Sequence, residues 1–192
     1  MRPRSKILIA PFSALAIFIA LVAADFLFPP DMSRYENVSR EVDARDGTLL
    51  RPFLSKDGDW RLKTSVRDVD PRYLTLLKAY EDKRFDAHFG VDPIAVARAA
   101  FQYATAGHVI SGASTLSMQA ARLLEPHRTR NVLAKLGQMI RAIQLEERYS
   151  KDRILSIYLT LAPFGGNIEG VRAASLTYFG KEPATLDLSE SA

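Results

Sequence analysis

The sequence contains no cysteine and only three histidines among its 192 residues. Without cysteine the chain can form no disulfide, no thiolate metal site and no thiol nucleophile. The histidines, His88, His108 and His127, are too scattered to predict a histidine-rich metal centre. No internal repeat or low-complexity segment is present either. The chemistry left open is that of carboxylate, hydroxyl, amide and basic side chains.

The sequence also has little net charge of either sign. The formal charge is +4, and part of it comes from Arg2, Arg4 and Lys6, which precede the first apolar run. The rest of the chain is close to neutral and gives no reason to expect a nucleic-acid partner. Apolar residues make up 47% of the chain and charged residues 25%, which is typical of an ordered protein. The length suits one domain plus an appendage.

The longest uncharged run covers residues 7–24 and continues as an apolar segment to Phe28. This segment of about 22 residues is long enough to cross a bilayer. The basic residues before it predict a cytoplasmic N-terminus and a body outside the cytoplasm. We therefore expect residues 1–30 to form a cytoplasmic tip and a single-pass transmembrane anchor. The small residues Val22-Ala23-Ala24 leave a cleaved signal peptide as the alternative.

The remaining chain divides into a linker, residues 31–65, and a mainly α domain, residues 66–192. Residues 31–40 are expected to be a polar linker. Asp46-Gly47 and Asp57-Gly58 are turn signals that predict short β-hairpins over residues 41–64. A glycine-rich loop is expected at residues 163–170. Helices are predicted over residues 71–80, 93–106, 115–124, 131–149, 150–162 and 171–178.

The last residues, 186–192, resemble the first turn of a further helix with Ser189 as its N-cap. A domain seldom ends one turn into a helix. The sequence therefore predicts that the α domain is truncated at residue 192.

Residues 81–92, EDKRFDAHFGVD, concentrate titratable groups beside an apolar run. Buried charge is costly unless it is paired, whereas a site that moves a proton and holds an anion needs such groups. A solvated helix end would also explain a lone acid pair. However, residues 111–119, SGASTLSMQ, place hydroxyls and free amide groups at a helix N-terminus, which suits a pyrophosphate or sugar. The two segments together predict one site.

These two segments precede a third, residues 135–159, KLGQMIRAIQLEERYSKDRILSIYL. This ordered set resembles the family 51 peptidoglycan glycosyltransferases, the N-terminal domain of class A penicillin-binding proteins. The resemblance covers roughly residues 60–192 and implies a lysozyme-like fold. It implies a membrane-anchored enzyme that polymerises lipid II into glycan strands and releases undecaprenyl pyrophosphate. The implied partners are lipid II, nascent glycan, the bacterial inner membrane and other cell-wall synthesis proteins.

The resemblance also implies roles for individual residues. Glu81 matches the catalytic glutamate and is expected to be the general base, with Asp82 either raising its pKa by like-charge repulsion or supporting the structure. His88 is expected to be a structural hydrogen-bonder and Asp92 a helix cap. The residues expected to bind substrate are Phe85, Arg98, Ser114, Thr115, Gln119, Arg122 and Lys135.

The third motif, RKxxE in most members, departs from the family pattern at two positions. Ala134 replaces the arginine. Gln138 replaces the second catalytic glutamate and is expected to be a catalytic residue together with Glu81. Glutamine keeps the shape and a carbonyl oxygen but loses the charge, so binding of Mg²⁺ or Mn²⁺ at that position should weaken. No individual metal ligand is predicted, but Mg²⁺ or Mn²⁺ stays open as a cofactor, because departure of the pyrophosphate needs positive charge or a metal. Glu146 or Glu147 could supply a carboxylate instead, although simple solvated charge is the expected role of both.

Two other functions stay open on the sequence. A non-catalytic envelope protein that binds lipid II or a partner synthase would explain Gln138 and Ala134. A lytic enzyme on a similar fold would also use a glutamate acid, but residues 111–119 and the anchor argue against it. Lipid II polymerisation is the leading hypothesis.

Overall fold

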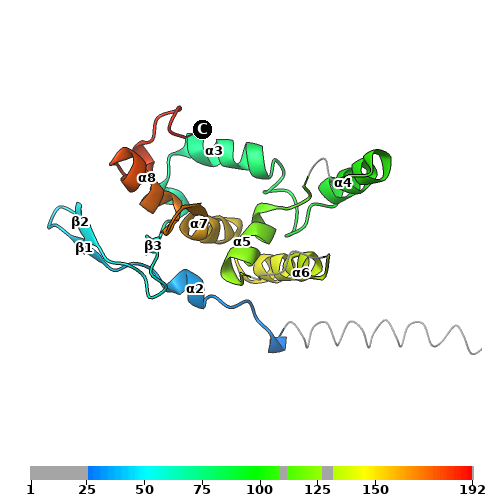
Figure 1. The fold of residues 1–192 in the computed structure, drawn as a ribbon, viewed down its shortest axis with the longest axis horizontal. Coiled ribbons are helices and arrows are strands. Elements are labelled where there is room, and N and C mark those ends of the chain that lie inside the picture. The colour runs from blue at the N-terminus through cyan, green and yellow to red at the C-terminus, as the bar shows by residue number, and fades with distance from the viewer. Residues whose placement is uncertain (1–25, 109–111, 127–131, 192) are drawn as a thin grey trace, which may run out of the picture. The chain divides into compact units, whose positions relative to one another are not determined.

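The computed structural model describes residues 26–108, 112–126 and 132–191, and this part of the chain is mainly helical (Figure 1). The chain divides into two compact units, Met1–Pro30 and Asp31–Ala192. The predicted anchor lies almost wholly outside the described residues. Within the described ranges, no helix is both long enough and apolar enough to cross a membrane.

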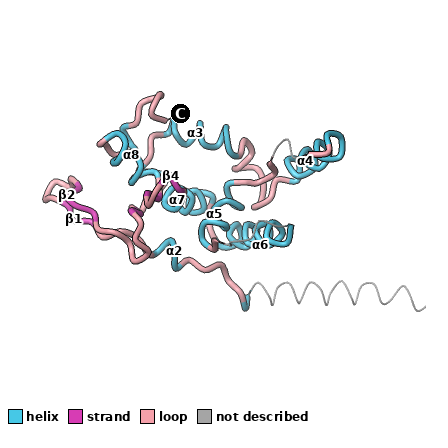
Figure 2. The backbone as a smooth tube through the Cα atoms, viewed as in Figure 1, coloured by secondary structure: helices cyan, strands magenta, loops and turns pink. Residues whose placement is uncertain are grey.

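The second unit consists mainly of helices with a few short strands, as Figure 2 shows by colour. In chain order the elements are α2 (Ser33–Glu36), β1 (Glu41–Asp43), β2 (Leu49–Pro52), β3 (Trp60–Arg61), η1 (Val66–Asp68), α3 (Pro71–Glu81), α4 (Pro93–Ala106), α5 (Leu116–Leu124), α6 (Val132–Arg148), α7 (Lys151–Leu161), β4 (Pro163–Gly165), β5 (Ile168–Glu169), α8 (Val171–Phe179) and η2 (Pro183–Thr185).

The six predicted helices are confirmed, and the residues at several of their ends show why they form. Asp70 and Ser150 accept hydrogen bonds from the first turns of α3 and α7. Gly107 ends α4 in the left-handed conformation. Helix α5 packs against both α6 and α7, and its buried face forms much of the core. Tyr80, near the end of α3, is 88% exposed.

The glycine-rich loop predicted at residues 163–170 contains two strands. β5 pairs with β4 in an antiparallel ladder and with β3 in a parallel one. Asp46-Gly47 joins β1 and β2 as predicted, but Asp57-Gly58 does not produce a second hairpin, because β3 pairs with distant β5. Local turn chemistry cannot reveal a strand partner about one hundred residues away.

The polar linker expected at residues 31–40 includes the short helix α2, which is held in place by a buried arginine. The Arg61 side chain is fully buried, and its Nε donates to Glu169 Oε2 at 2.6 Å. Its Nη1 donates to the α2 C-terminal carbonyls of Arg34 at 3.2 Å and Asn37 at 2.7 Å. A buried charge that is this fully hydrogen-bonded ties α2 and β3 to β5.

At the C-terminal end, residues 187–191 form a helical turn, but its cap is Asp187 rather than Ser189. Asp187 Oδ1 accepts from the Glu190 amide at 2.9 Å, and Glu190 Oε2 accepts from the Asp187 amide at 2.8 Å. This reciprocal pair is a capping box, and the spacing D-x-x-E could have predicted it.

Candidate active site

Glu81 is the last residue of α3, and it contacts the first turn of α5. Gln119 Nε2 donates to Glu81 Oε2 at 2.7 Å. Since α3 ends at Glu81, the chain turns away and leaves this carboxylate half-buried at the helix end. The two segments that the sequence predicts to form one site are therefore in direct contact.

A pocket of about 230 Å³ opens beside this contact. Its lining comes from the residue before the α5 cap, from α5 itself and from the middle of α6, and consists of Ser114, Met118, Gln119, Arg122 and Gln138. Lys135, one helical turn before Gln138, donates from Nζ to Ser114 Oγ. Most of the residues predicted for the site thus line this pocket or hydrogen-bond to its lining.

The electrostatics of the pocket suit an anion beside a carboxylate. Burial, together with the positive charge of Arg122, lowers the pKa of Lys135. On the other side, burial and the negative charge of Glu81 raise the pKa of Tyr158 to about 12. Burial also raises the pKa of Tyr73, with smaller contributions from Tyr158 and Glu81. The two tyrosines keep their protons at neutral pH and border Glu81, and the sequence motifs contain no signal for them.

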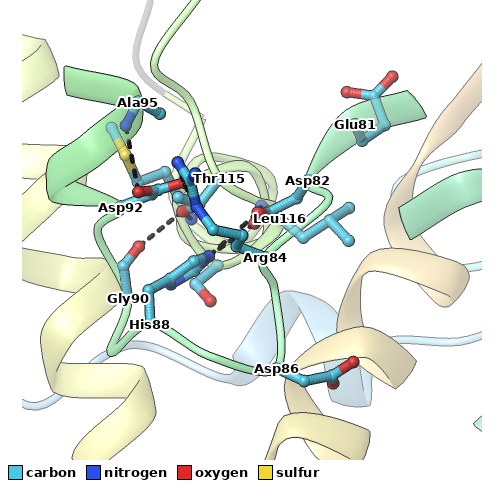
Figure 3. A network of polar contacts seen from close by, with 12 residues as sticks. Glu81, Asp82, Arg84, Asp86, His88, Gly90, Asp92, Ala95, Thr115 and Leu116 are labelled. Atoms are coloured by element: carbon cyan, nitrogen blue, oxygen red, sulfur yellow. Dashed lines mark hydrogen bonds and ion pairs between the residues drawn. The ribbon is translucent and has the colours of Figure 1, made fainter. Parts of the chain in front are cut away.

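Asp82 faces away from Glu81 and binds the backbone of α5 (Figure 3). Its Oδ2 accepts from the Leu116 amide at 2.9 Å and lies 2.9 Å from His88 Nε2. Within the described residues, His88 Nδ1 is buried without a hydrogen-bond partner. Of the two roles expected for Asp82, this geometry supports the structural one.

Thr115 and Asp92 fix the backbone around the site. Thr115 caps α5 by accepting from the Met118 amide at 3.1 Å, and its hydroxyl donates to the Gly90 carbonyl at 2.6 Å. Asp92 caps α4, and its Oδ2 accepts from Arg84 Nη2 at 2.6 Å. Burial opposes ionisation of Asp92, but Arg84 and the capped amides outweigh burial and lower its pKa. The cap expected at Asp92 is present.

Two predicted substrate-binding residues lie elsewhere. Phe85 is 1% exposed and belongs to the core, with Lys151 Nζ 4.5 Å from the centre of its ring. Arg98 is exposed on α4 and is not among the described residues that line the pocket. Sequence spacing places Arg98 on the helix after the acid pair. Whether the Arg98 side chain reaches the pocket depends on the direction of α4, which the spacing does not give.

The donor set of the pocket does not fit a resident divalent cation. Mg²⁺ and Mn²⁺ prefer carboxylate oxygens, whereas the described lining contains no carboxylate and includes Arg122. No group of three or more aspartate, glutamate, histidine or cysteine side chains gathers as a metal site within the described ranges. Glu146, considered as a substitute for the glutamate replaced by Gln138, is 4% exposed and hydrogen-bonded elsewhere. The expectation of a solvated Glu146 is wrong, while Glu147 is 48% exposed.

Comparisons with known proteins show which family this chain is similar to. The family model described as Transglycosylase matches residues 46–192. Penicillin-binding protein 1C of Escherichia coli (strain K12) is 50% identical over 183 residues, which is 95% of this chain and 23% of that protein. Penicillin-binding protein 1A of the same organism is 34% identical over 85% of this chain and 19% of its own length. A biosynthetic peptidoglycan transglycosylase of Marinomonas sp. (strain MWYL1) is 42% identical over 65% of this chain and 56% of its own length.

The chain spans about a quarter or less of the length of the two penicillin-binding proteins. The family match nevertheless covers part of the linker and all six predicted helices, Glu81 and the pocket included. On this match and these identities, the chain belongs to the transglycosylase family and is similar to the N-terminal part of penicillin-binding protein 1C.

Proposed function

We propose that this chain polymerises lipid II into glycan strands at the outer face of the bacterial inner membrane. The observation that carries the proposal is the contact between Glu81 and Gln119, which joins a carboxylate to a pocket bordered by Lys135 and Arg122. Family membership implies lipid II as the substrate. A base next to a cationic anion site is what glycosyl transfer from a pyrophosphate requires.

In the proposed reaction, Glu81 accepts the proton of the 4-hydroxyl of one lipid-linked disaccharide. The hydroxyl oxygen forms a bond to the anomeric carbon of the growing strand, and the bond from that carbon to the pyrophosphate oxygen breaks. Undecaprenyl pyrophosphate leaves with the bonding electrons. Lys135 and Arg122 offset its charge, so the proposed mechanism routes no step through a metal.

The proposed location is supported by apolar side chains on α4 and α6. These exposed side chains are Ile94, Phe101, Tyr103, Leu133, Leu136 and Ile140. Exposed apolar side chains gathered on two helices suit contact with lipid better than contact with water.

The test is polymerisation of lipid II by the purified chain, by Glu81→Gln and by Glu147→Gln. Glu147 is the matched control because it makes the same substitution on an exposed part of α6. The proposal expects polymer and released undecaprenyl pyrophosphate from the parent and the control, and at least about a hundredfold less from Glu81→Gln. Lipid II binding without polymer in the parent would favour the binding-protein alternative that Gln138 suggests. Cleavage of finished glycan would favour a lytic enzyme.

A further inference from the structure

A second polar cluster contacts the same helix and loop that form the pocket, and its charged members do not line it. It centres on Glu146 of α6, whose side chain is 4% exposed. Glu146 Oε1 accepts from Ser117 Oγ at 2.5 Å and from Lys151 Nζ at 2.7 Å. The cluster therefore joins α5, α6 and α7 through one buried carboxylate.

Lys151 extends the cluster to the loop after Glu81. Its Nζ also donates to the His88 carbonyl at 2.6 Å. His88 in turn contacts Asp82, and Asp82 accepts from the amide of Leu116, the residue before Ser117. These contacts form a chain of interactions that begins at Ser117 and returns to α5 at the neighbouring residue, Leu116. We call this chain of contacts the circuit.

This circuit contacts α5 on a different side from the contact with Glu81. Ser117 and Gln119 are two residues apart, so their side chains point about 200° apart around the helix. Ser117 is held by Glu146 on one side while Gln119 reaches Glu81 on the other. A small rotation of α5 would move Gln119 and Arg122 relative to Glu81 together.

We propose that Glu146, Lys151 and Ser117 are positioning residues that hold the pocket at its working distance from Glu81. The expected effect on kcat rests on the proposed function, since it is measured as polymerisation of lipid II. Its structural consequence, a fixed first turn of α5, is independent of any reaction. A buried carboxylate paired with one cation and one hydroxyl is suited to this role, because breaking either contact leaves a buried charge poorly satisfied.

The least disruptive test is Ser117→Ala, with Ser156→Ala as its control. Both serines are buried and donate one short hydrogen bond, but Ser156 Oγ donates at 2.7 Å to the Asp152 carbonyl within α7. Ser117→Ala should lower kcat about tenfold and also lower the melting temperature, because the buried Glu146 carboxylate loses one of its partners, whereas Ser156→Ala should leave kcat unchanged. Glu146→Gln should lower kcat further, and the double variant should lose no more than Glu146→Gln alone, because both act through one contact.

Amide hydrogen exchange supplies a readout that needs no turnover. In Ser117→Ala, exchange should quicken about tenfold over residues 116–119 and stay unchanged over α7. An inactive parent protein would refute the proposed function. The exchange rates over residues 116–119 would still test the positioning role in that case. Unchanged exchange over residues 116–119, or equal loss of kcat in Ser156→Ala, would overturn the inference.

Discussion

Gly90 allows the loop after Glu81 to approach the backbone of α6, and its replacement by alanine tests that packing. Gly90 has φ +77°, and a Cβ there would lie 2.8 Å from the carbonyl carbon and oxygen of Ala142 and from the amide nitrogen of Ile143. Backbone atoms in a helix cannot move aside as a flexible side chain can. Alanine at residue 90 must therefore either strain α6 or displace the loop.

The magnitude follows from two terms. A left-handed backbone costs alanine about 1–2 kcal/mol, and forcing an extra carbon into a packed region costs about 1–3 kcal/mol. Gly90→Ala should therefore destabilise the protein by about 2–5 kcal/mol. Gly107→Ala is the matched control, because Gly107 has φ +72° and nothing in the described part of the chain lies within 4 Å of the position that its Cβ would occupy. The control should be destabilised only by the cost of the left-handed backbone, about 1–2 kcal/mol.

The assay is urea unfolding of both variants, with lipid II polymerisation measured on the folded proteins. Displacement of the loop would also weaken the hydrogen bond from Thr115 to the Gly90 carbonyl, so activity should fall more in Gly90→Ala than in the control. Equal loss of stability in the two variants would refute the close approach of this loop to α6.

Four further predictions concern Lys135, Asp92 and Gln138. Because its pKa is lowered, Lys135 loses its proton below the ordinary lysine value of 10.5, and inorganic pyrophosphate should bind less tightly as the pH rises toward that value. Lys135→Arg should move this loss of binding to higher pH, because arginine keeps its charge. A pH dependence of pyrophosphate binding that is the same in Lys135→Arg would contradict the role of Lys135. Asp92→Ala should cost about 1 kcal/mol more than Asp92→Asn in urea unfolding, because asparagine still caps α4. The lowered pKa of Asp92 means that its ionised form stabilises the fold above pH 3.8, and this contribution is lost as pH falls through the lower folded value; Asp92→Asn should flatten that part of the stability profile. Gln138→Glu should bind Mn²⁺ more tightly than the parent in a titration followed by electron paramagnetic resonance, and equal binding would contradict the conclusion that the pocket lacks the carboxylate a divalent cation needs.

Much of the fold could be predicted because its signals are local. The starts of α3, α4 and α7 follow from Asp70, Asp92 and Ser150, whose side chains satisfy free amide groups within three residues. The β4 and β5 strands could not be predicted in the same way. Their pairing involves β3, and no short-range pattern in a glycine-rich stretch identifies a partner so far away.

The helices, the family resemblance, the acid pair and the loss of charge at Gln138 can all be recognised in the sequence alone. Glu81 and Gln119 can also be assigned to one site there, because both belong to ordered motifs. Which charges are solvated and which are buried depends instead on the packing of the helices. Glu146 and Glu147 are neighbours in the sequence, yet one joins three helices and the other is exposed, because successive residues of a helix point about 100° apart. The surroundings of a carboxylate, which set its chemistry, are therefore fixed only when whole helices come together.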